Sequence, residues 1–243
     1  MNGSRAVVVG DVIDDIIVVP SGPVRPDTDT VARITRHEGG SAANTAAWMA
    51  SLGAPVDFVG CVGAGDRERH GGVLRDLGVT AHLSEHPSLA TGTIVIVVDG
   101  EQRTMLTDRG ANAALRAASV TDAMLSDAAV LHLSGYSLVD AFTAADLGDL
   151  IARAHAHDAI VTLDPGSAGF IADYGVAEFR AALRGVDLLL PNHDEGRLLA
   201  SAHDDRAIVA SLLEIVPAMV LTRGAGSVLI ARRGAPTTEV AVE

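Results

Sequence analysis

The sequence predicts a layered α/β fold with a mainly parallel central sheet covered by helices. Its 243 residues suffice for one large domain, so a single domain over residues 1–243 is expected. Hydrophobic residues make up 48% of the chain but aromatic residues only 3%, which indicates a core of small aliphatic side chains. Short apolar runs also alternate with helix-like segments along the chain.

The first apolar run, at residues 6–9, ends at Gly10. It predicts a buried central strand with functional loops at its carboxyl end. Residues 16–19 and 31–36 predict two further strands, separated by a turn region rich in proline, glycine and aspartate. These two strands are expected to form a small sheet off the main body, within about residues 12–38.

An alanine-rich helix is predicted over residues 42–52, because glycines precede and follow this run. A strand at residues 56–59 comes next. Asp66 is then expected to cap a helix that runs to Leu77. The charged start of this helix, from Arg67 to Arg69, is expected to be a solvated face. Two extended segments follow, at residues 93–98 and 103–106.

The second half of the chain alternates regularly between strand and helix patterns. The predicted strands are residues 129–133, 160–163, 186–190, 218–221 and 228–231. The predicted helices are residues 140–155, 176–183, 193–200 and 207–215. Repeated β-α units imply a parallel sheet with its ligands at the carboxyl ends of the strands, so functional residues are expected there.

Charge and composition exclude several classes of function. The net charge of -13, with no cluster of lysine or arginine, argues against a nucleic-acid partner, although a nucleotide could still bind at a helix start. The single thiol, Cys61, allows no internal disulfide and fits a reducing, cytoplasmic location. No run of about 18 apolar residues predicts a membrane span. The dispersed histidines, His155 and His157 included, make a metal cluster improbable.

The glycine pair before the alanine-rich helix is the most informative motif. Gly39 and Gly40, followed by Ser41, would let a ligand approach the backbone at the helix start. Asn44, one turn into the helix, offers a donor and an acceptor to a hydroxyl. On its own the pair is more typical of a simple turn before a packing helix than of a ligand site.

The wider context favours a binding role. The stretch from Gly39 through Asn44 to Gly63-Ala64-Gly65-Asp66 resembles the amino-terminal signature of the ribokinase-like (PfkB-type) carbohydrate kinases. The resemblance implies a three-layer α/β/α fold with a small β lid. It also implies ATP-dependent phosphorylation of a sugar hydroxyl, with a nucleoside as the near alternative; the scarcity of aromatic residues in the early segments favours a sugar.

The resemblance implies roles for individual residues on the substrate side. Asp15 matches the family's sugar-binding aspartate and Asp11 is a second candidate, whereas Asp14 is expected to face solvent. Two carboxylate oxygens suit a pair of adjacent hydroxyls. The segment ending in Asn112, and the segment from Ser134 to Tyr136, resemble further pocket walls. The expected substrate-binding residues are Asp11, Asp15, Gly39, Gly40, Ser41, Asn44, Asn112 and Gly135.

A second strong motif, Pro191-Asn192-His193-Asp194-Glu195, resembles the family's ATP side. Asn192 follows a predicted strand, and Glu195 would hold Mg²⁺ through water at the ATP phosphates. A helix cap formed by these two residues is equally compatible with the pattern. Thr222 and Gly224 resemble nucleotide contacts, although the glycine spacing after Gly224 is one residue short. ATP and Mg²⁺ are therefore the expected cofactors.

The family's Gly-Ala-Gly-Asp motif, which supplies the catalytic base, is expected beyond Glu243, so no catalytic residue is expected in this chain. The copy ending at Asp66 lies inside the amino-terminal signature and is rejected. A catalytically silent sugar- or nucleoside-binding protein is the alternative to a kinase, and a nicotinamide-dependent dehydrogenase is excluded because Gly10 opens no G-x-G-x-x-G turn. Lids of this family often pair between subunits, which makes a homodimer a further hypothesis.

Overall fold

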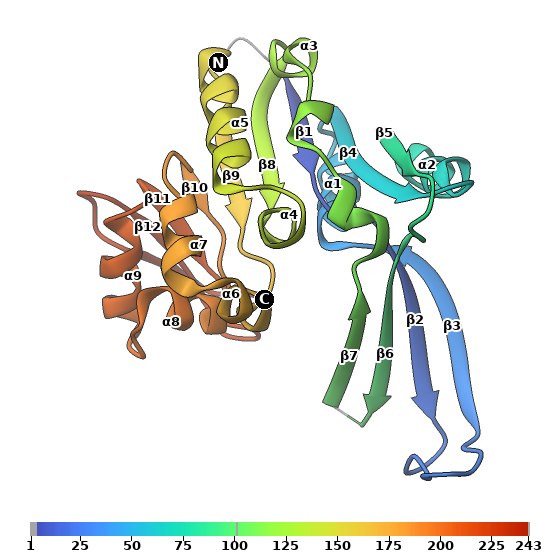
Figure 1. Cartoon of the computed structure of the whole chain (residues 1–243). Coiled ribbons are helices and arrows are strands. Elements are labelled where there is room, and N and C mark those ends of the chain that lie inside the picture. The colour runs from blue at the N-terminus through green and yellow to red at the C-terminus, as the bar shows by residue number, and fades with distance from the viewer. Residues whose placement is uncertain (1–3, 101, 243) are drawn as a thin grey trace.

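The protein has a nine-stranded central sheet and a separate four-stranded sheet that extends away from it (Figure 1). The computed structural model describes residues 4–100 and 102–242. Glu243, beyond which the catalytic aspartate is expected, lies outside the described residues. The central sheet has the order β13-β12-β11-β10-β9-β8-β1-β4-β5, and every pair from β11 to β5 is parallel.

The strands of this sheet follow the predicted alternation closely. They are β1 (Arg5–Val9), β4 (Val56–Gly63), β5 (Val79–His86), β8 (Ala128–Ser134), β9 (Ile160–Asp164), β10 (Leu188–Leu189), β11 (Ala218–Leu221), β12 (Val228–Arg232) and β13 (Thr238–Val240). The prediction for residues 218–221 is confirmed to the residue. Two strands were not predicted from the sequence: β5, which pairs parallel with β4, and β13, which pairs antiparallel with β12.

Helices cover both faces of the central sheet, as the layered fold requires. The α-helices are α1 (Ser41–Ser51), α2 (Arg67–Asp76), α3 (Asp122–Leu125), α4 (Gly135–Asp140), α5 (Ala144–Ala156), α6 (Ala168–Tyr174), α7 (Val176–Ala182), α8 (His193–Ala200) and α9 (Asp205–Leu213). Two 3₁₀ turns, η1 (Gly110–Ala114) and η2 (Ala117–Ser119), precede α3. Among the described residues, none of these helices has the length and apolar character needed to cross a membrane.

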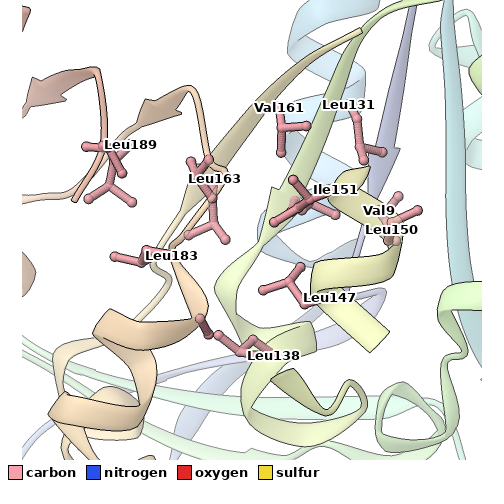
Figure 2. Close-up of a cluster of buried hydrophobic side chains, with 14 of the residues drawn as sticks. Val9, Leu131, Leu138, Leu147, Leu150, Ile151, Val161, Leu163, Leu183 and Leu189 are labelled. Atoms are coloured by element: carbon pink, nitrogen blue, oxygen red, sulfur yellow. The ribbon is translucent and has the colours of Figure 1, made fainter. Parts of the chain in front are cut away.

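The core is divided by the sheet, and β1 shows how. Val7 and Val9 point into a large cluster beneath α5, whereas Val8 points into a smaller cluster beneath α1. Successive side chains of a strand face opposite sides, so an all-apolar strand serves both layers. In the larger cluster, Leu150 and Ile151 of α5 pack over the neighbouring strands (Figure 2).

The starts of α5 and α2 depart from the sequence prediction in position and in capping, respectively. The helix predicted from residue 140 begins at Ala144, because Thr143 forms a capping box with Asp146. Residue 140 instead ends the separate short helix α4. Asp66 does precede α2 as expected, but its carboxylate makes no capping hydrogen bond. It accepts hydrogen bonds from Thr91 and Arg69 instead.

The four-stranded sheet has the order β3-β2-β6-β7. Its strands are β2 (Ile13–Pro20), β3 (Ala32–Gly39), β6 (Gly92–Asp99) and β7 (Gln102–Asp108). The sequence predicts the first two as a small sheet, and the extended segments near residues 93–98 and 103–106 join them. The pairing of β2 with β6 is parallel, and the other two pairs are antiparallel.

Candidate functional site

A cavity of about 430 Å³ lies where the four-stranded sheet meets the carboxyl end of β1. It brings the acidic end of the first strand and the glycine pair together, as the sequence predicts for one ligand pocket. Its lining residues are Asp11, Asp15, Gly40, Ser41, Asn44, Ile94, Ile96, Met105, Thr107, Arg109, Tyr136, Ser167 and Phe170. The lining therefore combines polar groups from the end of β1, β2 and the start of α1 with aliphatic side chains of β6 and an aromatic wall formed by Tyr136 and Phe170.

Asp11 holds the start of helix α1. Its Oδ2 accepts a hydrogen bond from the backbone N–H of Ser41 at 2.7 Å, and Oδ1 accepts from the N–H of Ala42 at 3.3 Å. The hydroxyl of Ser134 donates a further bond to Oδ1 at 3.0 Å. The N-cap residue Gly40 has no side chain with which to cap the helix, so Asp11 supplies the missing acceptor. Asp11 thus lines the cavity mainly as an anchor for α1.

Asp15 faces the cavity beside the glycine pair. Burial raises the pKa of its carboxyl, and the charge of Asp11 acts in the same direction. The carboxylate lies in the space left by the absent side chain of Gly39, where a Cβ would be 2.2 Å from Oδ2 of Asp15. Gly40 is constrained more directly, because it has φ of 113° and a Cβ there would lie 2.4 Å from the carbonyl oxygen of Asp11.

Asn44 is exposed on α1, three residues after Ser41, and lines the same cavity as Asp15. Its amide can donate one hydrogen bond and accept another. An acceptor on β2 and a donor on α1 therefore face one space from two directions. This arrangement suits a ligand that carries several hydroxyl groups.

Three expected substrate contacts do not line the cavity, and one of them, Gly39, lies behind the Asp15 carboxylate. The other two have different surroundings. Asn112 does not line the cavity: its Oδ1 accepts from the N–H of Val12 at 2.9 Å, and its Nδ2 donates to the carbonyls of Val12 and Arg109. It is 3% exposed and joins η1 to the connection between β1 and β2. Gly135 is also outside the lining, and a Cβ there would lie 2.2 Å from the carbonyl oxygen of Pro165. Both residues shape the protein near the cavity without facing it.

The aromatic wall is the part of the site that sequence reasoning missed. Tyr136 and Phe170 meet edge to face, with ring centroids 5.6 Å apart and an interplanar angle of 78°. The guanidinium carbon of Arg109 lies 4.5 Å from the centroid of the Tyr136 ring. Ser134-Gly135-Tyr136 does predict a pocket wall, but nothing local marks Phe170, which is on α6.

The residues expected on the ATP side meet at the carboxyl ends of β10 and β11. Asn192 forms a bridge with Thr222. It also forms a capping box with Glu195: the Asn192 amide oxygen accepts from the N–H of Glu195, and the Glu195 carboxylate accepts from the Asn192 backbone at 2.9 Å and its side chain at 2.6 Å. The cap that the sequence allows is therefore present. Gly224 follows with φ of 62° and no atom within 4 Å of an added Cβ.

Glu195 is 2% exposed, and burial raises the pKa of its carboxyl to about 7. The charge of Asp164, at the end of β9, raises it too, while the hydrogen bonds from Asn192 lower it. Burial likewise raises the pKa of Asp164, with a contribution from Asp11. The carboxyl ends of β1 and β9 and the start of α8 therefore form an acidic row at one edge of the sheet.

This row offers carboxylate oxygens of the kind that Mg²⁺ binds. No group of three potential metal-ligating side chains is found among residues 4–100 and 102–242. The carboxylate oxygens of Asp164 and Glu195 nevertheless fit a hard cation, because Mg²⁺ takes oxygen ligands and is usually held by one or two carboxylates together with phosphates. Binding through water and nucleotide phosphates would satisfy such a site without a full set of protein ligands.

Comparison with known proteins gives a consistent result. The profile described as pfkB family carbohydrate kinase matches residues 4–242. A bifunctional protein HldE from Shewanella amazonensis is 31% identical over 204 residues; the match covers 79% of this chain and 40% of that protein, so the chain spans less than half of this relative.

Two solved structures show the same fold. The adenosine kinase from Sinorhizobium meliloti superposes with a TM-score of 0.86 at 23% identity, covering 100% of this chain and 81% of that one. The fructokinase with bound ATP from Xylella fastidiosa gives a TM-score of 0.80 at 24% identity, covering 98% and 77%. The ribokinase-like α/β fold expected from the sequence is therefore confirmed.

Proposed function

We propose that this chain, which belongs to the pfkB family of carbohydrate kinases, acts in the ATP-dependent phosphorylation of a hydroxyl group on a small polyhydroxylated molecule. The observation that carries the proposal is the cavity shared by Asp15 and Asn44, at the carboxyl edge of the sheet. Ligands of open α/β sheets bind at this edge. Kinases need such a polar pocket next to a site for triphosphate.

On the substrate side, the Asp15 carboxylate accepts hydrogen bonds from two adjacent hydroxyls, while Asn44 and the start of α1 at Ser41 bind others. Asp11 keeps that helix start in place. Because burial and Asp11 raise the pKa of Asp15, this carboxylate gains most from ligand groups that donate hydrogen bonds. We assign the catalytic base to no described residue.

On the nucleotide side, Asn192, Glu195, Thr222 and Gly224 border the ATP phosphates, and Mg²⁺ would be held by Glu195 through water. The cation would neutralise charge on the phosphoryl group during transfer. Asn192 fixes the Glu195 carboxylate through the capping box. Glu195 therefore offers carboxyl oxygens that are already oriented before nucleotide binds.

The test is ligand binding with a matched pair of variants. D-fructose and adenosine are titrated separately into the wild type, Asp15→Asn and Asp149→Asn, with and without ATP and Mg²⁺, and phosphorylated product is measured. Asp149 is exposed on α5, away from the cavity, so its variant should behave as the wild type. Asp15→Asn should weaken binding by about tenfold or more, since charge-assisted hydrogen bonds are the strong ones. Equal affinity in both variants would exclude Asp15 from the substrate site.

The aromatic wall supports a nucleoside as a second candidate substrate. Tyr136 and Phe170 offer apolar surface opposite Asp15, and a base could pack there while its ribose meets the carboxylate. The variant Phe170→Ala should then weaken adenosine binding more than D-ribose binding. Equal losses for both compounds would favour a sugar without a base.

We also propose that the outer face of the four-stranded sheet pairs with a second copy of the chain. Strand register places six aliphatic side chains on the face opposite Asp15: Ile16, Val18, Ile34, Val95, Val97 and Leu106. Ile34 and Leu106 are each 60% exposed. Leu106→Asp should convert a dimeric mass in light scattering to a monomeric one, while Leu52→Asp, at an exposed site elsewhere, should not. A monomeric wild type would contradict the proposal.

A further inference from the structure

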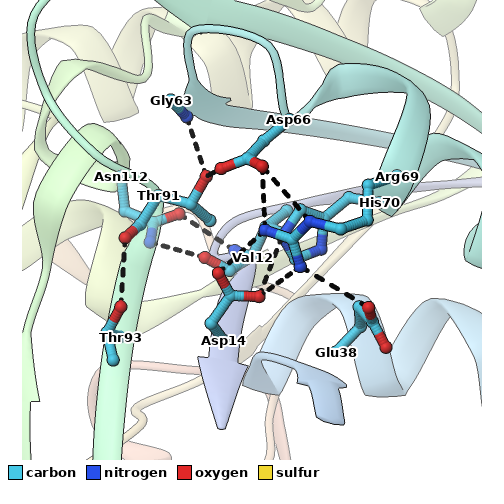
Figure 3. A network of polar contacts seen from close by, with 10 residues as sticks. All are labelled: Val12, Asp14, Glu38, Gly63, Asp66, Arg69, His70, Thr91, Thr93 and Asn112. Atoms are coloured by element: carbon cyan, nitrogen blue, oxygen red, sulfur yellow. Dashed lines mark hydrogen bonds and ion pairs between the residues drawn. The ribbon is translucent and has the colours of Figure 1, made fainter. Parts of the chain in front are cut away.

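Helix α2 presents Arg69 to the four-stranded sheet, near the point where this sheet joins the body of the protein (Figure 3). Its Nη1 and Nη2 atoms donate to the two carboxylate oxygens of Asp14 at 2.6 and 2.8 Å. Nη1 also lies 3.5 Å from Oε1 of Glu38. Asp14 and Glu38 are paired across β2 and β3. One planar guanidinium therefore contacts two neighbouring strands, in a geometry that a lysine cannot reproduce.

The Arg69 guanidinium also contacts Asp66, the residue that precedes α2. Nε and Nη2 of Arg69 lie 3.2 and 3.0 Å from Oδ1 of Asp66. Oδ2 of Asp66 accepts a 2.5 Å hydrogen bond from the hydroxyl of Thr91, which accepts a bond from the N–H of Gly63 (Figure 3). Arg69 is exposed, as the sequence predicts, and Asp14 is partly exposed, but both side chains are also paired within the protein. Arg69 is thereby fixed to β4 and to the connection between β5 and β6.

Asp14 and Glu38, which Arg69 contacts, are the immediate chain neighbours of Asp15 and Gly39. Successive side chains on a strand point to opposite faces, so Asp15 faces the cavity while Asp14 faces Arg69. Gly39, which follows Glu38, lies against the Asp15 carboxylate. The contact of Arg69 with β2 and β3 therefore lies directly behind the contact between Asp15 and Gly39.

We propose that Arg69 is a positioning residue for the substrate-binding carboxylate of Asp15, an inference that rests on the function proposed above for Asp15. By binding Asp14 and Glu38 together, it fixes the relative placement of β2 and β3 at the residue where Asp15 enters the cavity. Arg69 itself reaches no cavity atom, so it acts only through these strands. Its second effect is to neutralise the charge of Asp14.

The charged groups around Asp15 define what loss of Arg69 should do. They are Asp11 from the end of β1, His37 on β3, Asp14 on the same strand and Arg109 on the cavity wall. Burial and the charges of Asp11 and Asp14 raise the pKa of Asp15, whereas His37 lowers it. Without Arg69 the carboxylate of Asp14 loses its guanidinium partner and keeps only the contact with His70, whose Nε2 lies 3.3 Å from Oδ1 of Asp14 and whose pKa is lowered by burial. The pKa of Asp15 should therefore rise further.

The test compares Arg69→Gln with Arg75→Gln in the ligand-free protein. Arg75 is on the same helix and is likewise paired with a carboxylate, that of Glu68, but has no contact with β2 or β3. The Asp15 carboxyl is titrated by NMR, and an Asp15→Asn variant assigns its signal. Arg69→Gln should raise the pKa of Asp15 and shift the amide signals of Asp15 and Gly39; Arg75→Gln should change neither.

Two more variants separate the effect of Arg69 on the position of Asp15 from its effect on the charge around Asp15. Asp14→Asn removes the negative charge next to Asp15, so the pKa of Asp15 should fall. The same substitution weakens the contact of Arg69 with β2, so the amide signals of Asp15 and Gly39 should still shift. Arg69→Lys keeps the positive charge but cannot form the bidentate contact with Asp14, so its amide shifts should lie between those of the wild type and Arg69→Gln. It also covers the case in which Arg69→Gln fails to fold.

Binding adds a functional measure. Affinity for D-fructose or adenosine, whichever binds the wild type, should fall about tenfold in Arg69→Gln, because a displaced carboxylate loses its charge-assisted bonds. A lower melting temperature with an unchanged Asp15 titration and unchanged amide signals would reduce Arg69 to a stabilising contact and overturn the proposal. If neither compound binds the wild type, the proposed substrates are wrong, and the titration still decides the role of Arg69.

Discussion

Replacing Glu195 with glutamine should remove a pH dependence from the stability of this protein. Burial raises the pKa of the Glu195 carboxyl from 4.5 to about 7 in the folded state. Between these values the folded protein keeps a proton that the unfolded chain has released. The free energy of unfolding therefore falls as pH rises through this window, and the loss is complete above about pH 7.

The magnitude follows from the same two values. Each pKa unit corresponds to about 1.4 kcal/mol, so the loss amounts to about 3 kcal/mol between pH 4.5 and pH 8. Other groups titrate as well: burial lowers the pKa of His132 to about 4, which makes stability rise with pH. Subtracting the variant from the wild type cancels such distant groups. Asp164 is coupled to Glu195, so the difference reports this pair.

Urea unfolding of the wild type and Glu195→Gln, from pH 5 to pH 8, measures the difference. Wild-type stability relative to the variant should fall as pH rises, and Glu214→Gln, at an exposed residue on the end of α9, should follow the wild type. Parallel curves for wild type and Glu195→Gln would refute the reasoning. Mg²⁺ with ATP should reduce this pH-dependent difference in the free energy of unfolding, because a nearby cation favours the ionised carboxylate. If the difference stays the same, the cation binds away from Glu195.

Four further substitutions test the cavity and the fold. Gly39→Ala should keep the fold, since φ is not positive there, but should weaken D-fructose or adenosine binding by about tenfold or more in calorimetry as the new Cβ displaces Asp15. Gly148→Ala, in open space on α5, should leave binding unchanged and add about 0.5–1 kcal/mol of stability. Leu150→Ala should lower the free energy of unfolding by about 3–5 kcal/mol, measured in urea, because the side chain is fully buried. Thr143→Ala should lower it by about 1–2 kcal/mol through loss of the capping box.

Local chemistry explains which elements the sequence predicts well. The helix at residues 193–200 is confirmed to the residue because Asn192 and Glu195 mark its start within four positions. The start of α5 was misplaced because the apolar periodicity continues through the short helix α4, and only the capping box at Thr143 separates the two. The sequence pattern of β13 is polar and exposed, so nothing in it distinguishes a strand from a loop.

The candidate site likewise contains residues that local motifs predict and residues that they do not. Gly40 and Asn44 were predicted as site residues because turn chemistry and a helix start determine their surroundings within a few residues. Phe170 and Arg69 come from other elements, so their surroundings depend on contacts far along the chain. Asn112 shows the opposite case, since its motif is local but its amide is used by Val12, 100 positions away.

Asp14 and Asp15 show which structural information the sequence pattern lacks. They are adjacent, identical in type and equally close to the end of the first strand, yet one meets Arg69 and the other faces the cavity. Strand alternation separates them as soon as β2 is known to pair with β6, because Asp15 then shares a face with Ile94. That pairing is parallel and joins segments about 80 residues apart, so no hairpin turn announces it in the sequence. The role of each aspartate is therefore set by tertiary pairing, which is why Arg69, a residue outside every motif, emerges as the partner that fixes Asp15.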